Sequence, residues 1–128
     1  MVNGLVRGLS IFAYTGMFHM VAPVIRAFDA GLVDVARCIN YKMLPAMAME
    51  TSPGGHIFLK RLFAAQGIFA GSHDREPLPK NWDAQASAEV DAMVAYSLRL
   101  MDEIEKTFPN ISHCDAFPIP QDRPYLLR

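Results

Sequence analysis

The chain has 128 residues, enough for one modest hydrophobic core and too few for two, so we expect a single domain over residues 1–128. Its hydrophobic fraction of 52% lies above the usual range, while charged residues make up only 20%. The net charge of −1 argues against the basic face that a nucleic-acid-binding protein needs. This excess of apolar residues indicates that part of the molecule faces lipid or another protein.

The N-terminal segment, residues 1–28, is the most apolar part of the chain. Residues 8–25 carry no formal charge, and Arg7 and Arg26 flank them. As a helix this run would span about 27 Å, close to the thickness of a bilayer core. We therefore expect a membrane-grade helix at about 8–25, and no clear cleavage site follows it to indicate a signal peptide.

Several residues in this run also fit a different structure, a buried helix of a soluble bundle. Pro23 should break or kink the last turn of the helix, and three side chains in the run are polar: Ser10, Thr15 and His19. If the run spans a membrane, the basic residues that follow it place the C-terminal bulk on the matrix or cytoplasmic side. Residues 1–28 contain no acidic side chain, as is typical of a segment imported into an organelle.

Residues 29–71 are predicted to be helical in two pieces. Asp29 is expected to cap the first, and Pro45 is expected to kink or end it. Residues 52–55, Ser-Pro-Gly-Gly, form a clear break, and residues 57–71 then predict an interfacial or packed amphipathic helix.

Two glycine pairs have the GxxxG spacing that lets membrane helices pack closely, namely Gly4 with Gly8 and Gly67 with Gly71. We interpret them as candidate helix contacts, although this spacing is common by chance.

After a polar, proline-containing loop at 72–82, the clearest element of the chain is an amphipathic helix at about 83–107 within the region 83–108. Apolar or small side chains recur along it at alternating intervals of four and three: Val90, Val94, Ser97, Met101, Ile104 and Phe108. Its C-terminal part is acidic, which opposes the helix dipole. We expect either a basic partner surface or simple solvation of that acidic face.

Residues 109–128 predict an extended, proline-rich tail, because three prolines within seven residues exclude a regular helix. Phe117 and Tyr125 are among its apolar side chains, which suggests that the tail lies along a surface of this chain or of a neighbour.

No local catalytic or nucleotide-binding motif is present, and we predict no catalytic residue, no cofactor and no metal. His19 is a weak candidate for a quinone or haem contact, with a plain hydrogen bond as the alternative. Residues 113–115, His-Cys-Asp, are too close together to make a zinc site alone. Two cysteines so far apart, Cys38 and Cys114, favour free thiols over a disulfide.

These observations predict an all-α fold of three to four helices. The leading functional hypothesis is a small non-catalytic accessory subunit of a membrane protein complex, most naturally in the mitochondrial inner membrane, with protein subunits and lipid as partners. The alternative is a soluble helical bundle that dimerises or binds an apolar ligand; an enzyme using His19, His73 and Asp74 ranks third. The expected partner interface comprises Gly4, Gly8, Gly67, Gly71, Val90, Val94, Met101, Ile104, Phe108, Phe117 and Tyr125.

Overall fold

A computed structural model describes residues 15–75 and 77–107 of the chain. The described residues are helical with no strand, which confirms the predicted all-α fold. In chain order the elements are a 3₁₀ helix η1 (Thr15–Met20) and four α-helices, α1 (Val21–Asp29), α2 (Val33–Glu50), α3 (Gly55–Ala65) and α4 (Ala84–Thr107).

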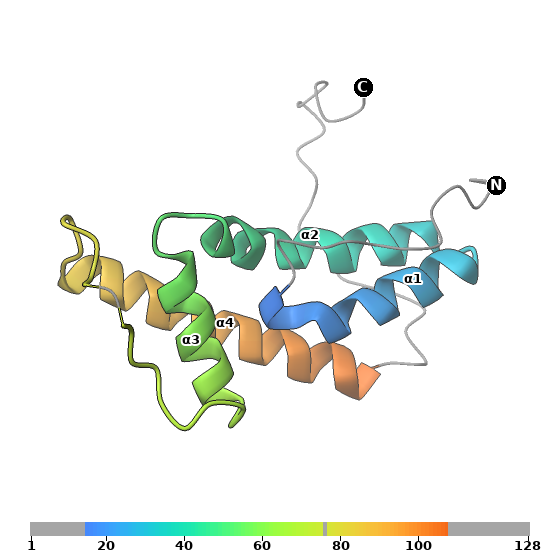
Figure 1. Ribbon diagram of the computed structural model, residues 1–128. Helices are drawn as coiled ribbons and strands as arrows, with labels where there is room; N and C mark the ends of the chain where they lie inside the picture. The colour runs from blue at the N-terminus through green and yellow to red at the C-terminus, as the bar shows by residue number, and fades with distance from the viewer. Residues whose placement is uncertain (1–14, 76, 108–128) are drawn as a thin grey trace, which may run out of the picture.

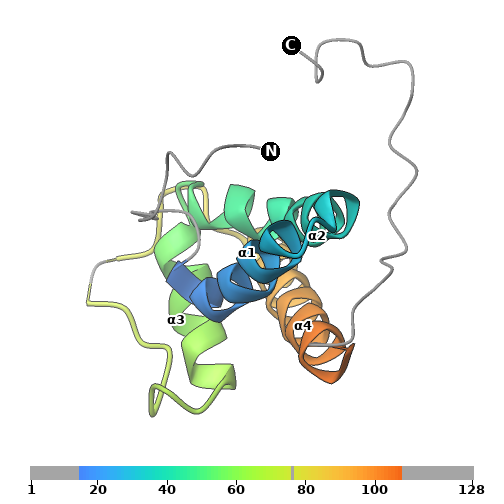
Figure 2. The same cartoon turned by 90° about the vertical axis from the view of Figure 1, so that its right-hand side faces the viewer.

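The two longest helices, α2 and α4, contact each other directly, and α2 also contacts α1 and α3 (Figures 1 and 2). Helix α1 folds back on α2 as a hairpin, and α3 crosses the first half of α4 (Figures 1 and 2). The 3₁₀ helix η1 contacts both α3 and α4, and its Gly16, Met17 and Met20 are buried.

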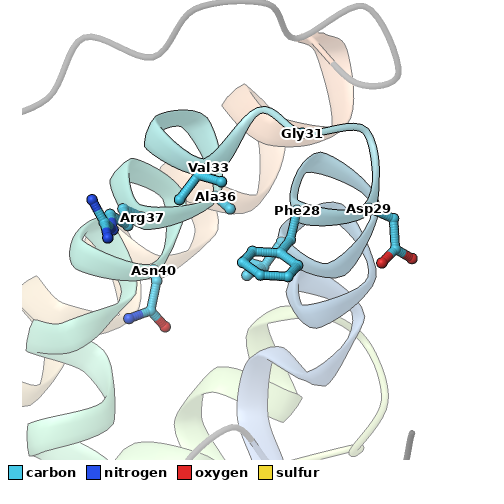
Figure 3. A pocket seen from close by; sticks show the side chains of 8 residues that line it. Phe28, Asp29, Gly31, Val33, Ala36, Arg37 and Asn40 are labelled. Atoms are coloured by element: carbon cyan, nitrogen blue, oxygen red, sulfur yellow. The ribbon is translucent and has the colours of Figure 1, made fainter. Parts of the chain in front are cut away.

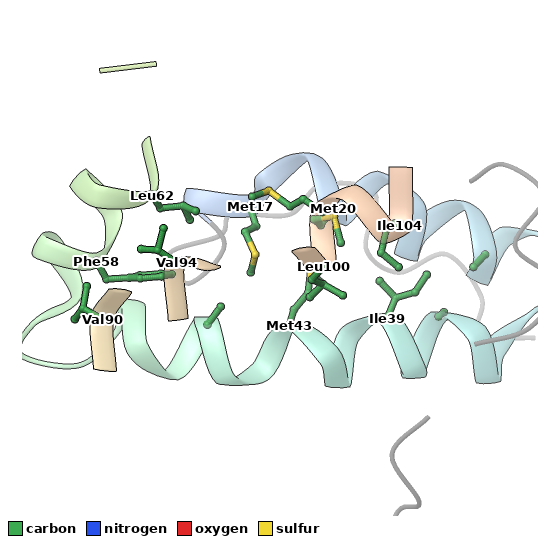
Figure 4. Packing of buried hydrophobic residues seen from close by; sticks show 14 of the residues in the cluster. Met17, Met20, Ile39, Met43, Phe58, Leu62, Val90, Val94, Leu100 and Ile104 are labelled. Atoms are coloured by element: carbon green, nitrogen blue, oxygen red, sulfur yellow. The ribbon is translucent and has the colours of Figure 1, made fainter. Parts of the chain in front are cut away.

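The core forms where one stripe of each helix meets the others (Figure 4). On α2 the buried side chains recur at intervals of three and four, the spacing that keeps them on one face. The α4 stripe is buried in the same way and packs against it. The best-buried large members of this core are Met17, Met20, Ile39, Met43, Phe58, Leu62, Val90 and Ile104.

The N-terminal run does not form the single helix predicted at 8–25. Residues 8–14 lie outside the described residues, while Met17 and Met20 of η1 are buried in the core. Pro23 stands in the first turn of α1, where the missing N–H has no intrahelical partner to lose, so it starts a helix instead of breaking one. Within residues 15–75 and 77–107, no helix combines the length and apolarity that a membrane crossing requires.

The hairpin between α1 and α2 depends on Gly31, not on the predicted cap at Asp29. Asp29 is the last residue of α1, and Leu32, at the cap position of α2, makes no side-chain cap. Gly31 adopts a φ of 79°, which favours glycine, and the N–H of Leu32 bonds to the carbonyl of Ala27 at 2.8 Å.

Pro45 was expected to kink or end its helix, and it does not end α2. The helix continues to Glu50 because its opposite face, with Met43 and Ala46, is held in the core while Pro45 faces solvent. The predicted break follows, with a turn at residues 51–54. Gly55 then starts α3 so close to α2 that a Cβ on it would lie 1.9 Å from the carbonyl oxygen of Glu50.

The third helix ends at Ala65, earlier than the predicted 71, because Gly67 turns the chain with a φ of 73°. The loop predicted at 72–82 is observed as such, and α4 matches the predicted helix at 83–107 closely. Asp83 caps α4, since its carboxylate accepts a 2.8 Å hydrogen bond from the N–H of Ala86.

Cys38 is disulfide-bonded and buried, so the expectation of a free thiol at this position is wrong. Spacing along the sequence gave no sign of this, because a disulfide depends on which segments the fold brings together. The only other cysteine of the chain, Cys114, lies outside the described residues.

Candidate functional site

A groove of about 630 Å³ runs between α1 and the first half of α2. Its walls combine apolar side chains with a few polar ones (Figure 3): Val24, Phe28, Asp29, Gly31, Val33, Ala36, Arg37 and Asn40. Phe28 reaches from α1 toward α2, whereas Asp29 points away from α2 (Figure 3). The lining of the groove is therefore mixed, with apolar side chains from both helices and the polar side chains of Asp29, Arg37 and Asn40.

The outer face of α1 beside this groove carries large apolar side chains in solvent. Ile25 is 47% exposed and Phe28 is 40% exposed, and they lie three residues apart on neighbouring positions of the helix surface. Leu32, just before α2, is also an exposed apolar residue in this hairpin. We call Ile25, Phe28 and Leu32 the α1 face.

The groove offers little chemistry of its own. Its ionisable side chains are Asp29 and Arg37, and Arg37 lies 3.8 Å from the exposed carboxylate of Asp34. Among the residues that the structure describes, no group of three or more His, Cys, Asp or Glu side chains could hold a metal ion.

A second polar cluster joins α2 to α4. Lys42 forms a 2.8 Å salt bridge with Glu103, and the Tyr96 hydroxyl donates a 2.7 Å hydrogen bond to the Lys42 carbonyl. Burial raises the pKa of the Tyr96 phenol above its ordinary value, while nearby Lys42 acts in the opposite direction. A phenol held in its neutral form is a hydrogen-bond donor, so this cluster fastens two helices together.

The acidic end of α4 finds basic partners within the chain itself. Besides the Lys42 bridge to Glu103, Lys106 lies 2.6 Å from Asp102 one turn earlier. These two lysines offset part of the unfavourable interaction between the acidic side chains and the helix dipole. A basic surface on another protein is not needed for this effect.

The predicted partner interface on α4 lies in the core of the chain. Val90, Val94, Met101 and Ile104 are all buried against the other helices, so as the helices stand they are not accessible to a partner. Gly67 ends α3 and Gly71 lies in the loop after it, so this pair does not form a helix-packing face. The remaining predicted interface residues lie outside the described residues: Gly4, Gly8, Phe108, Phe117 and Tyr125.

The predicted chemical candidates are not brought together. The backbone of His19 belongs to η1, and its side chain lies outside the described part of the structure, as do residues 113–115. His73 and Asp74 lie in the loop after α3, where Lys60 bonds to the carbonyl of His73 and to the carboxylate of Asp74. These contacts fasten the loop to α3.

Sequence analysis missed two contacts that organise the bundle. Glu50 is buried and its carboxylate accepts a 2.9 Å hydrogen bond from the N–H of Thr15, while Gly16 N lies 3.5 Å from its other oxygen. Trp82 packs so closely on Gly54 that a Cβ there would lie 2.7 Å from its ring. Both contacts join segments far apart in sequence, so no local pattern signals them.

No protein-family model, no curated protein and no solved structure matches this chain. The residues that the structure describes form helices without a strand. They carry a groove between α1 and α2 and the exposed apolar α1 face.

Proposed function

We propose that this chain is a small non-catalytic accessory subunit of a larger protein assembly, and that it docks on its host through the α1 face and the adjoining groove. The observation that carries the proposal is the exposure of Ile25 and Phe28, which lie three residues apart on α1 directly beside the groove. Large apolar residues that cluster at a groove are typical of protein interfaces.

The host of this proposal is a membrane complex, in keeping with the apolar N-terminal region of the sequence. Since Met17, Met20 and Pro23 face the core, the proposal attaches the protein through the outer face of α1. Disulfides persist in oxidising compartments, so the bonded state of Cys38 favours the oxidising side of the host membrane. The positive-inside argument favoured the matrix side, and we give the disulfide more weight because it concerns the folded chain directly.

The test compares two exposed apolar positions. Phe28→Asp places a charge in the α1 face, and Ile68→Asp places the same charge in the loop after α3, where the side chain is 60% exposed. Native gel electrophoresis of extracts from cells expressing each variant would report the size of the assembly. We expect the wild type and Ile68→Asp to migrate in a large complex and Phe28→Asp to be released from it, since a charge at the centre of an interface costs roughly 2 kcal/mol or more.

Circular dichroism of both variants should match the wild type, because both positions are exposed. A wild-type protein that migrates as a free monomer would contradict the proposal, and so would equal behaviour of the two variants. Carbonate extraction of the same membranes would then show whether the host complex is membrane-bound.

The groove also favours a second candidate function, a helical bundle that binds a small apolar ligand. Its volume of about 630 Å³ suits such a ligand, and Val24, Phe28 and Ala36 supply an apolar wall. Native mass spectrometry of the protein purified from its own cells distinguishes the two functions. A small bound molecule that is lost in Phe28→Asp would favour the ligand, while co-purifying protein subunits favour the assembly.

A further inference from the structure

The groove between α1 and α2 lies next to a large exposed side chain. Its lining residues all come from these two helices and the turn between them, so no other element among the described residues contributes to it. Two of them leave room for a visiting side chain: Ala36 is short, and an added Cβ at Gly31 would meet no atom within 4 Å. Phe28, which is 40% exposed, reaches from α1 toward α2 (Figure 3). One short stretch of surface therefore carries both a projecting apolar ring and a hollow beside it.

The two sides of the groove carry opposite charges. Arg37 lies on the α2 side with a side chain that is 66% exposed, and its contact with the carboxylate of Asp34 is long, at 3.8 Å. Asp29 lies at the end of α1 and points away from α2, so within one chain it does not face Arg37 (Figure 3). Among the residues that line the groove, the positive side chain thus belongs to α2 and the negative one to α1.

A surface with these features is complementary to itself. If a second copy is turned by 180° about an axis that runs along the groove, its α1 lies against the first copy's α2, and its α2 lies against the first copy's α1. Phe28 of each copy then faces the hollow near Ala36 of the other, and Arg37 of each copy faces Asp29 of the other. Because the contact is two-fold, each of these pairings occurs twice. Two helical hairpins that meet in this way form a four-helix bundle with antiparallel neighbours.

We propose that two copies of the free chain pair through the α1 face and the groove, and that the host displaces the second copy when the chain joins its assembly. This inference rests on the proposed function, since it concerns the regulation of the same surface. Helix α1 has nine residues and is about 13 Å long. A contact of this length is small beside the interfaces of stable dimers, so the pair is weak and exchanges readily. A weak pair covers the exposed apolar side chains and still yields to the host.

The test measures pairing of the purified full-length chain with no host present. Sedimentation velocity from low micromolar to several hundred micromolar protein gives the dissociation constant of the dimer. We expect a reversible monomer–dimer equilibrium for the wild type. Phe28→Asp should raise the dissociation constant by roughly tenfold or more, because it places a charge in the apolar part of the contact. The matched control Ile68→Asp, at a 60% exposed position in the loop after α3, should leave the constant unchanged.

Reversing the charges tests the two-fold geometry. Arg37→Glu and Asp29→Lys should each raise the dissociation constant by roughly tenfold, since each places like charges opposite each other at two points of the contact. The double variant, Arg37→Glu with Asp29→Lys, restores opposite charges at both points, so its constant should lie within about threefold of the wild type. Both positions are exposed, and circular dichroism of all variants should match that of the wild type.

A wild-type chain that stays monomeric over the whole concentration range would overturn the proposal, as would a dimer that Phe28→Asp leaves unchanged. A double variant that pairs no more tightly than the single variants would also overturn it, because Arg37 and Asp29 would then not face each other. So would a dimer held by a disulfide between chains, which non-reducing denaturing gels detect. Failure of pairing leaves the native-gel test of the host untouched, and a chain that pairs but never joins a larger complex would refute only the host.

Discussion

Glu50 connects the end of α2 to the start of the described chain. A carboxylate at the C-terminal end of a helix opposes the helix dipole, yet here it accepts hydrogen bonds at the N-terminal end of η1, where negative charge is favourable. Sequence alone could not identify this role, because Glu50 and Thr15 are 35 positions apart and no pattern links them.

Replacing Glu50 tests the strength of this connection. We expect Glu50→Ala to lower the free energy of unfolding by roughly 1–3 kcal/mol, because the N–H groups of Thr15 and Gly16 lose a buried acceptor. Glu50→Gln keeps one acceptor oxygen and should cost less. Urea denaturation followed by circular dichroism measures both, with the exposed position Glu105→Ala as the control. If Glu50→Ala and Glu50→Gln lowered the free energy of unfolding by the same amount, the hydrogen bonds to Glu50 would contribute little to stability.

Tyr96 makes the stability of the bundle depend on alkaline pH. Burial raises the pKa of its phenol from the ordinary value of 10.0, so the folded state holds the proton more tightly than the unfolded state. This contribution to stability is fully present below the unfolded pKa and is lost as the pH rises through the folded pKa.

We therefore expect the free energy of unfolding to fall less steeply above about pH 10 in Tyr96→Phe than in the wild type. At neutral pH the variant should be less stable by about 0.5–1.5 kcal/mol, because the hydrogen bond to the Lys42 carbonyl is lost. Denaturation curves over a pH series measure both effects, and Tyr41→Phe, at an exposed position, serves as the comparison. If the free energy of unfolding fell equally steeply with pH in the wild type and in Tyr96→Phe, the Tyr96 phenol would not contribute to the alkaline loss of stability.

At the scale of elements, the sequence predicts α4 well and the N-terminal helices poorly. The α4 stripe repeats at intervals of three and four over many turns, which only a helix satisfies. Pro23 starts a helix instead of breaking one, because a proline in a first turn is harmless. Pro45 does not end α2, because the packed face behind it holds the helix in place. That information lies in the packing and not in the local sequence.

The sequence predicts a partner interface along the α4 stripe, whereas the structure buries this stripe in the core, and Ile104 tests the observed arrangement. Ile104 is 2% exposed, so Ile104→Ala should destabilise the isolated chain by about 2–5 kcal/mol through lost burial and a new cavity. The neighbouring exposed substitution Glu105→Ala should change stability by less than about 0.5 kcal/mol. Thermal or urea unfolding of the purified chain measures both. If Ile104→Ala had the same free energy of unfolding as the wild type, the apolar stripe of α4 would not be part of the core.

At the scale of the whole molecule, the apolar excess of the composition divides into three parts. One part fills the core, as the buried stripes of α2 and α4 show. A second part is the α1 face, which we assign to a partner. The third part is exposed elsewhere, on the outer side of α2 and in the loop after α3. The composition indicates an excess of apolar residues, but it does not show which of them are buried and which are exposed. That depends on which faces of the helices pack against each other.

The disulfide of Cys38 gives the last prediction, which concerns the stability of the entire chain. The one other cysteine of the sequence, Cys114, lies 76 positions further along, so a bond between the two would close a long loop. Such a bond stabilises the folded state mainly by restricting the unfolded chain, typically by about 2–4 kcal/mol. The core itself does not require the bond, because α2 and α4 are also joined by the Lys42–Glu103 salt bridge and by buried side chains.

We therefore expect Cys114→Ser to lower the free energy of unfolding by about 2–4 kcal/mol while the helix content stays unchanged. Wild type treated with a reductant should fall to the stability of the variant, and the variant should not respond to the reductant. Urea denaturation with and without reductant, followed by circular dichroism, measures all four states. A wild type that is insensitive to reductant would contradict the closed loop, whereas loss of helix in Cys114→Ser would show that the bundle needs the disulfide in order to form.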